Sequence, residues 1–229
     1  MSEDLANIFF VKNCSLAAIA TGEKASSLVE LRDQLTTVDE SCLYYHFWGA
    51  RLNPKFVHPQ YHNDFADWVY QRLHDQILAE KLSIIDPTDY NLESLRQELI
   101  DTVERRLDDY EIALWTRKED QFHFIRSTTV VFEKSVRIER PEDLPQIIET
   151  LSPGSIFYHF IDARRRTIDK IDDFSVWLKM FGQQYTLLIE KIQAIDPYFL
   201  SLTEVRDELV KIAHRYFRTI EIDSKARSL

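Results

Sequence analysis

An internal repeat constrains the fold of this chain more than any other feature of its sequence. The segment YYHFWGAR, at residues 44–51, returns in the second half of the chain as FYHFIDAR, at residues 157–164. Further matches follow in the same order: Asp64-Phe65 with Asp173-Phe174, Trp68 with Trp177, and Ile85-Asp86-Pro87 with Ile195-Asp196-Pro197. Matches that keep their order with only small gaps are typical of a tandem duplication. We therefore predict two repeats, at residues 1–115 and 116–229.

Each repeat opens with two β-rich stretches, at residues 8–11 and 16–20 in the first repeat and at residues 122–125 and 129–132 in the second. Their β-branched and aromatic content predicts strands that form a β-hairpin at the start of each repeat. The rest of each repeat favours helix, because the 229 residues include only four glycines and many Leu, Glu, Arg and Gln residues. We predict a hairpin followed by several helices in each repeat.

Apolar periodicity and capping residues place these helices. Leu43, Phe47 and Ala50 share one helical face, and the second repeat has the matching pattern. Asp64 and Asp173 stand just before apolar helical stretches, where a side-chain oxygen can accept the free N–H groups of a first turn, so we predict them as N-caps. Capping boxes are predicted at Ser27 with Glu30 and at Ser201 with Glu204.

The predicted fold class is α+β, dominated by helix. A surface that pairs with its copy about a twofold axis stays self-complementary when two copies are fused. We therefore expect a pseudo-twofold arrangement, in which the β segments of both repeats join one small antiparallel sheet. The segment from Arg117 to Gln121 is not rich in Pro, Gly or Ser, so we expect the repeats to pack as one integrated body rather than as tethered domains.

Charge and hydropathy exclude several classes of function. The net charge is −10, and residues 1–115 carry 10 Lys and Arg against 20 Asp and Glu, whereas residues 116–229 carry 18 of each. An acidic chain without a basic stripe is a poor binder of nucleic acid. The sequence also shows neither a long apolar run nor a signal peptide, so we expect no membrane partner and a cytoplasmic location. Cys14 and Cys42 are expected to be buried and free.

Three segments carry a family resemblance: SIFYH at residues 155–159, NDFADWV at residues 63–69 and TGEKASSL at residues 21–28. With these segments the chain resembles an uncharacterised bacterial domain-of-unknown-function family of duplicated proteins. The resemblance implies a bacterial, cytoplasmic protein and brings no assigned activity. The second repeat departs from the pattern at Asp172-Asp173 and lacks the Thr-Gly turn, so the resemblance does not imply that both repeats do the same work.

A duplicated set of Tyr, His and Arg side chains is the main candidate for a binding site. Its members are Tyr45, His46 and Arg51 in the first repeat and Tyr158, His159 and Arg164 in the second. A histidine can act as a general base, a tyrosine can donate a hydrogen bond, and an arginine can bind an anion. Each histidine also borders an apolar helical face, where it would equally serve as a hydrogen-bonded structural residue.

Metal and cofactor motifs are weak in this sequence. His58 and His62 lie in the longer connection of the first repeat and could join His46 or Asp64 around zinc, but Pro59 between them argues against helical ligand spacing. The sequence carries no Gly-rich phosphate loop and no dinucleotide fingerprint. We therefore predict no catalytic residues, no metal and no cofactor.

Two hypotheses about function remain. The first is a protein-interaction or regulatory module without catalysis, because the chain is duplicated, its acidity is confined to one repeat, and no catalytic constellation is complete. The second is a small-molecule binding protein or enzyme that uses the Tyr, His and Arg clefts for anionic ligands. Convergence of these side chains on an open pocket would favour the second hypothesis, whereas burial and mutual hydrogen bonding would count against it.

Overall fold

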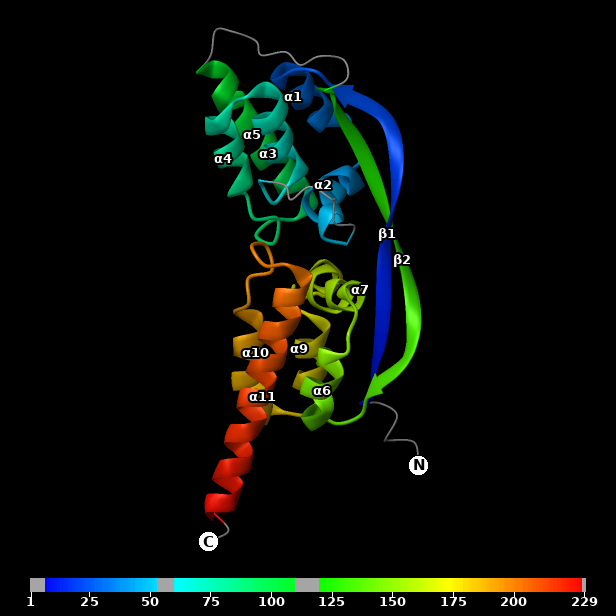
Figure 1. Ribbon diagram of the computed structural model, residues 1–229, viewed down its shortest axis with the longest axis vertical. Coiled ribbons are helices and arrows are strands. Elements are labelled where there is room, and N and C mark those ends of the chain that lie inside the picture. Colours follow the sequence, from blue (N-terminus) through cyan, green and yellow to red (C-terminus); the bar gives the residue numbers. More distant parts are fainter. Residues whose placement is uncertain (1–6, 53–59, 110–119, 228–229) are drawn as a thin grey trace. The chain divides into compact units, whose positions relative to one another are not determined.

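The computed structural model describes residues 7–52, 60–109 and 120–227 of the chain. It divides into two compact units (Figure 1). The first helical unit comprises Leu16–Val130, and the second helical unit comprises Met1–Ser15 together with Val131–Leu229. As predicted, helix dominates the described residues, alongside one small sheet.

The sheet consists of two long antiparallel strands, β1 (Phe9–Ala25) and β2 (Phe122–Ile138), each of 17 residues (Figure 1). The prediction that both β segments join one antiparallel sheet is thus confirmed, whereas the prediction of a hairpin inside each repeat is wrong. Asn13 and Cys14, which separate the strand stretches predicted at residues 8–11 and 16–20, lie within the continuous strand β1 and contact the start of α7 (Pro153–Ile156). Ser152 Oγ donates to Asn13 Oδ1 at 3.1 Å, and Cys14 Sγ donates to the Gly154 carbonyl at 3.4 Å. The polar side chains serve packing rather than a change of direction.

Each helical unit takes its strand segments from both repeats. In the second helical unit Phe9, near the N-terminus, lies 5.2 Å from Phe174 between ring centroids. In the first helical unit Phe122 lies 5.1 Å from Phe65 in the same stacked manner. The start of each strand therefore packs on helices that belong, in sequence, to the other repeat. The compact units cross the predicted repeat boundaries, which remain a prediction about the sequence.

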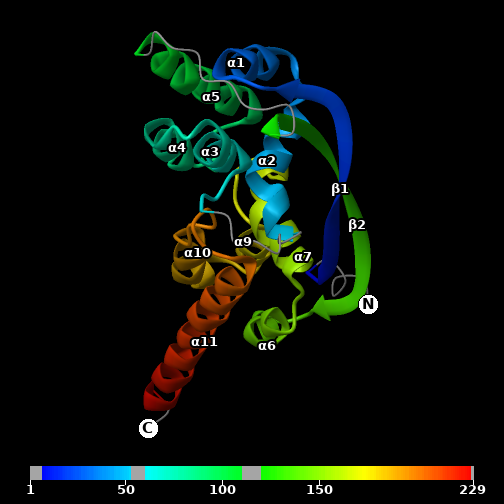
Figure 2. The ribbon, with the colours of Figure 1, turned by 45° about the horizontal axis from the view of Figure 1, so that its top comes forward.

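The helices of the first helical unit are α1 (Leu28–Thr37), α2 (Glu40–Leu52), α3 (Asp64–Trp68), the π-helical η1 (Val69–Leu73), α4 (Gln76–Ser83) and α5 (Leu92–Asp108). Helix α1 packs against α5, and α3 packs against α4 (Figure 2). The buried side chains of this core include Leu31, Leu35, Leu43, Phe47, Phe65, Leu78, Leu82 and Leu99. These are the residues at helical spacing in the sequence, so the periodicity located this core.

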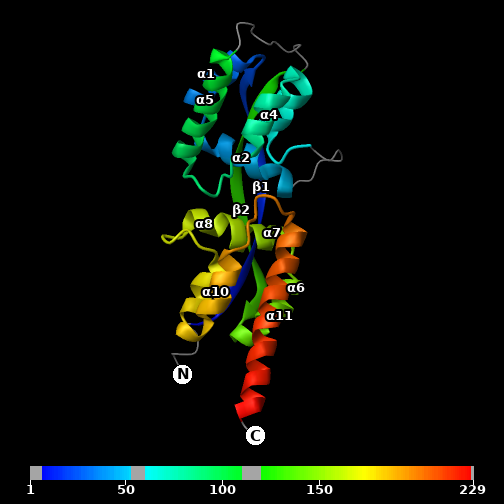
Figure 3. The ribbon, with the colours of Figure 1, turned by 90° about the vertical axis from the view of Figure 1, so that its left-hand side faces the viewer.

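The elements of the second helical unit are η3 (Pro141–Asp143), α6 (Leu144–Glu149), α7, the π-helical η4 (Phe157–Asp162), α8 (Ala163–Arg166), α9 (Asp173–Lys179), η5 (Gln183–Tyr185), α10 (Thr186–Gln193) and α11 (Leu202–Arg227). Helix α11 packs against α6, α7 and α10, and Figure 3 shows it beside α6. The π-helical turn carries His159. Such π-helical turns are often found at functional sites.

The helix caps differ from the prediction by one residue at two places. The N-caps are Asn63, whose Oδ1 accepts the N–H of Ala66 at 2.9 Å, and Asp172, whose Oδ1 accepts the N–H of Ser175 at 2.8 Å. Asp64 and Asp173 are instead the first residues of α3 and α9. Their carboxylates are therefore free of the capping role and can bond elsewhere. The capping box at Ser201 is confirmed. At Ser27 the hydroxyl caps the helix by accepting the Glu30 N–H, while the Glu30 carboxylate accepts the N–H of Ser26.

Both cysteines, Cys14 and Cys42, are buried and free, as predicted. Burial, together with the charge of Asp162, raises the pKa of Cys14 from 9.0 to about 12, and burial and Asp39 raise the pKa of Cys42. Neither thiol is therefore suited to act as a nucleophile at neutral pH. Within the described ranges, the helices are too short or too polar to cross a bilayer.

Candidate functional site

His46 of α2 is buried in the first helical unit, with 4% of its surface exposed. Its Nδ1 lies 2.9 Å from Asp64 Oδ2, and its Nε2 accepts the backbone N–H of Ile125, in β2, at 3.1 Å. The imidazole ring lies against Phe122 and Phe65, with centroid distances of 4.7 and 5.3 Å. The histidine thus connects one helix to a second helix and to a strand.

His159 of η4 is bonded in the same way in the second helical unit and is 3% exposed. Its Nδ1 lies 2.8 Å from Asp173 Oδ2, and its Nε2 accepts the backbone N–H of Lys12, in β1, at 2.8 Å. The ring lies 4.8 Å from Phe9 between centroids. The placement of Asp64 and Asp173 one residue past the cap is what brings a carboxylate to each histidine.

These bonds define the tautomer of both histidines. A backbone N–H can only donate, so the Nε2 atom that accepts it carries no proton. The proton of a neutral imidazole then resides on Nδ1, from which it is donated to the aspartate. Both ring nitrogens are therefore engaged, and His46 or His159 could bind a metal or accept a proton only after a strand hydrogen bond breaks.

A tryptophan reinforces each histidine at the start of its strand. Trp68 Nε1 donates to the Asp120 carbonyl at 2.8 Å, just before β2, and Trp177 Nε1 donates to the Asn7 carbonyl at 2.7 Å, just before β1. The histidine, its aspartate and the tryptophan together form what we term the strand clamp, His46–Asp64–Trp68 in one unit and His159–Asp173–Trp177 in the other. Because the imidazole accepts the N–H that a neighbouring strand would otherwise accept, the clamp replaces a third strand at this edge.

The two candidate tyrosines are packed beside the clamps. The ring of Tyr45 lies against Gly49, where a Cβ would come within 2.8 Å of it, so the glycine leaves the space that the ring occupies. Tyr158 is 8% exposed, and the guanidinium of Arg166 lies 4.0 Å from the centre of its ring. Both tyrosines also meet their histidine neighbours edge-on. Their positions are explained by packing.

The two candidate arginines lie over aromatic rings. Arg51 lies 5.1 Å from the ring centre of Trp48, and Arg164 lies 4.5 Å from that of Phe160 while donating to the Ile195 carbonyl at 3.2 Å. The structure therefore brings each histidine together with its tyrosine neighbour. It does not bring the six candidate side chains to the pocket that it describes, which lies elsewhere.

Two of the three arginines at residues 164–166 form ion pairs with a buried aspartate. Asp162 is 1% exposed, and its two oxygens accept from Arg165 at 3.0 Å and from Arg166 at 2.8 Å. Arg166 also reaches Asp173 at 3.0 Å, and so joins the strand clamp of the second helical unit. The guanidinium groups neutralise carboxylates of the same unit, which accounts for two of the three arginines without an external anion.

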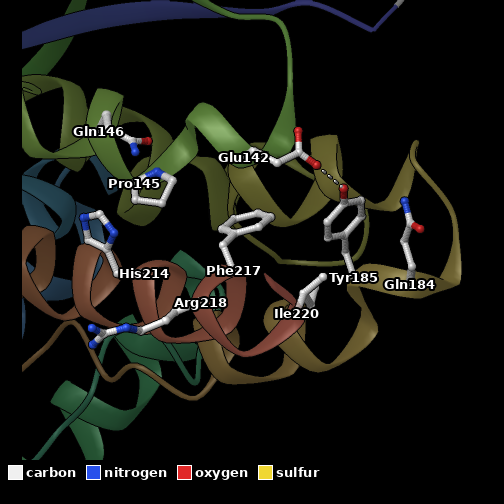
Figure 4. A pocket seen from close by; sticks show the side chains of 9 residues that line it. All are labelled: Glu142, Pro145, Gln146, Gln184, Tyr185, His214, Phe217, Arg218 and Ile220. Carbon is white, nitrogen blue, oxygen red and sulfur yellow. Dashed lines mark hydrogen bonds between the residues drawn. The ribbon is translucent and has the colours of Figure 1, made fainter. Parts of the chain in front are cut away.

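The pocket of the second helical unit has a volume of about 780 Å³ and lies between η3–α6, η5 and α11 (Figure 4). Its lining residues are Glu142, Pro145, Gln146, Gln184, Tyr185, His214, Phe217, Arg218 and Ile220. Tyr185 Oη donates to Glu142 Oε1 at 3.2 Å. Burial and the charge of Glu142 raise the pKa of Tyr185 to about 12, so the phenol keeps its proton and remains a donor.

Sequence reasoning missed this pocket because its residues match no motif. The signal that could have found it is a difference between the repeats. At the positions aligned with Tyr185 and Tyr216, the first repeat has Asp75 and Arg106. Arg106 donates to both oxygens of Asp75, at 2.7 and 3.0 Å, and both side chains are buried. A filled ionic contact in one unit thus corresponds to aromatic side chains beside a pocket in the other.

The possible zinc ligands fall partly outside the described residues, where His58 and Pro59 lie. His62 is described, and burial, with Arg51 nearby, lowers its pKa. Within the described ranges, the structure contains no group of three or more His, Cys, Asp and Glu side chains arranged to hold a metal.

The chain belongs to a family of unknown function, DUF5752, whose model matches residues 6–214. It is also similar to the solved structure of OrfY from Thermoproteus tenax, with 26% sequence identity and a TM-score of 0.76. That match covers 91% of this chain and 95% of OrfY. No curated protein matches the chain.

Proposed function

We propose that this member of the DUF5752 family is a protein-interaction or regulatory module of the cytoplasm that performs no catalysis. The observation that carries the proposal is the strand clamp. His46 and His159 are the side chains of the sequence best suited to acid–base chemistry, and both of their ring nitrogens are bonded within the fold. A general base needs a free lone pair directed at its substrate, and these lone pairs are directed at backbone N–H groups.

The surface supports the proposal by offering places for a partner. Large apolar side chains are exposed in both units, among them Ile77 and Ile84 in the first and Met180, Leu187 and Phe199 in the second. Residues 1–115 also carry an excess of acidic over basic residues. A partner with a basic face would associate faster with that repeat at low salt, because complementary charge steers encounter.

The absence of catalysis is tested by comparing the wild type with variants in which a clamp histidine is replaced. The full-length protein and two variants, His46→Gln and His159→Gln, are screened against hydrolase, transferase and lyase substrates, with circular dichroism to confirm folding. We expect no turnover in any of the three proteins. A wild type that turns over a substrate, with folded variants that do not, would contradict the proposal.

The positive part of the test is a purified partner. The tagged protein is isolated from its native host, and each co-purifying protein is produced separately and titrated against it by calorimetry. We expect one partner to bind with a fixed stoichiometry and with an affinity that falls as salt increases. If every candidate fails to bind as a purified component, the interaction function is refuted.

Binding of a small anionic ligand is a second candidate function. The observation that favours it is the pocket beside α11, and not the Tyr, His and Arg sets for which the sequence first suggested it.

A further inference from the structure

The pocket between η3–α6, η5 and α11 combines an apolar centre, an arginine, a histidine and several hydrogen-bonding groups (Figure 4). Its volume of about 780 Å³ lies within the range of roughly 300–1,000 Å³ that is usual for pockets binding small molecules. Such pockets generally pair an apolar wall with a few polar groups that orient the ligand. The lining of this pocket contains both apolar and polar side chains.

The centre of the pocket is an aromatic surface. Phe217 of α11 lies in the middle of the lining residues, with Pro145 on one side and Tyr185 on the other (Figure 4). The rings of Phe217 and Tyr185 are in contact, with centroids 6.2 Å apart, and Tyr185 is buried, so the phenylalanine has a fixed support. A half-buried phenylalanine ring of this kind offers a face on which a planar ring can stack.

One end of the pocket is formed by an arginine and a histidine. His214 and Arg218 are four residues apart on α11, so they project from the same helical face, and both line the pocket. Within the described part of the chain, neither side chain has a hydrogen-bond or ion-pair partner. An arginine remains charged at all ordinary pH values and binds carboxylate or phosphate oxygens in a bidentate manner. This end of the pocket is thus suited to an anionic group.

The other end presents acceptors. One carboxylate oxygen of Glu142 accepts a hydrogen bond from the Tyr185 hydroxyl, which orients the carboxylate. A carboxylate has acceptor capacity for further donors, so Glu142 can also accept an N–H group of a ligand. Gln184 adds an amide group at this end, whereas Gln146 lies beside Pro145, on the same side of Phe217 as His214. Figure 4 shows Glu142 and Tyr185 on the opposite side of Phe217 from His214.

The same chemistry is absent from the aligned positions of the first repeat. There, the positions of His214, Phe217 and Arg218 are occupied by Glu104, Leu107 and Asp108. The histidine and the arginine are replaced by acids, and the aromatic ring is replaced by an aliphatic side chain. The packing of a helix pair does not require such a reversal of charge on its solvent side, so this difference points to a ligand of the second helical unit.

We infer that the pocket binds a small molecule with a planar aromatic ring, an anionic group at one end and an N–H donor at the other. The ring stacks on Phe217, the anion binds Arg218 and His214, and the N–H group donates to Glu142. A purine nucleoside monophosphate and an indole carboxylate share this chemistry. The inference goes beyond the proposed interaction function and does not depend on the existence of a protein partner.

The test is calorimetric titration of the full-length protein with five probes. Adenosine monophosphate and indole-3-acetate carry both the ring and the anion. Adenosine and indole carry the ring alone, and inorganic phosphate carries the anion alone. We expect at least one of the two complete probes to bind, about 10-fold or more tighter than its ring alone and than phosphate, because a charge-assisted contact adds to stacking. Which complete probe binds identifies the source of the ligand.

Variants assign the binding to the pocket. Arg218→Gln and Phe217→Leu are each expected to weaken the complete probe about 10-fold or more. The matched control is Arg215→Gln, which removes the same charge from the same helix at an exposed residue outside the lining. We expect the control to bind within about twofold of wild type. Circular dichroism confirms that each variant is folded.

Three results would overturn the inference. The first is that neither complete probe binds wild type at millimolar concentration. The second is that phosphate binds as tightly as both complete probes, since the ring would then contribute nothing. The third is that Arg215→Gln weakens binding as much as Arg218→Gln, because the effect would then reflect the net charge of the helix.

Discussion

Replacing His159 by leucine tests whether the strand clamp stabilises the second helical unit. The substitution removes the acceptor of the Lys12 N–H and the donor to Asp173. An unsatisfied buried donor costs about 1–3 kcal/mol, and the partly buried Lys12 N–H falls toward the lower half of that range. Asp173 keeps its bond to Arg166 at 3.0 Å and is partly exposed, so its loss is about 1 kcal/mol. We expect a total loss of about 2–3 kcal/mol.

The conservative variant His159→Gln separates hydrogen bonding from ring packing. Its amide carries one acceptor and one donor group, so it can restore part of both bonds, although the ring contact with Phe9 is lost. We expect it to recover about half of the lost stability. The control is His123→Leu, since His123 is an exposed histidine of β2. A surface change of this kind is expected to alter stability by no more than about 0.5 kcal/mol.

Two measurements check this prediction. Urea unfolding gives the free energy of each variant, and hydrogen exchange followed at the Lys12 amide reports the strand bond directly. We expect His159→Leu to accelerate exchange at Lys12 and to leave the amides of α5, in the first helical unit, unchanged. A His159→Leu protein as stable as the His123→Leu control, with a protected Lys12 amide, would refute the clamp.

Three further predictions follow from buried contacts. Gly154→Ala should destabilise the protein by about 1–3 kcal/mol in urea unfolding, because the added Cβ would clash with Asn13 Oδ1 and the Cys14 carbonyl; a neutral result would mean that the strand can move away. Arg106→Met should cost about 3–5 kcal/mol, measured in the same way, because it strands a buried carboxylate, and a loss below about 1 kcal/mol would contradict that burial. A fragment of residues 16–130 should fold alone by circular dichroism, whereas the first repeat should not, because it lacks the start of β2 that packs on its helices; a folded first repeat would contradict this.

The sequence specified the helices well because their apolar residues recur at helical spacing. Leu43 and Phe47 are fully buried on the predicted face of α2, and the capping boxes lie where Ser and Glu are three residues apart. The prediction of hairpins is wrong for a physical reason. Residues that separate two strand-like stretches in a sequence can lie either in a turn or within one continuous strand, as they do in β1. Whether Asn13 and Cys14 turn the chain or contact α7 depends on a helix that lies far away in the sequence.

The candidate site was predictable in its members but not in its role. Sequence matches identified His46 and His159 as residues worth explaining, and both are central to the fold. Their role depends on which of two neighbouring residues caps the helix. Asn63 is the N-cap, so the carboxylate of Asp64 is available to bond His46. Capping rules name the residue types that suit the position, and two suitable residues in a row leave the choice to tertiary contacts.

The two helical units share the strand clamp but differ in the side-chain contact beside their last long helix, α5 in one unit and α11 in the other. The strand clamp requires an imidazole, a carboxylate and an indole in fixed positions, so a change in any of them would release the start of a strand, and both units retain all three. The contact beside the last long helix does not require particular side chains. The ion pair of Arg106 with Asp75 forms it in the first helical unit, and the rings of Tyr185 and Tyr216 form it in the second. The clamp residues that match between the units are therefore explained by folding. A function specific to the second helical unit is expected where the two units differ, at the surface of α11.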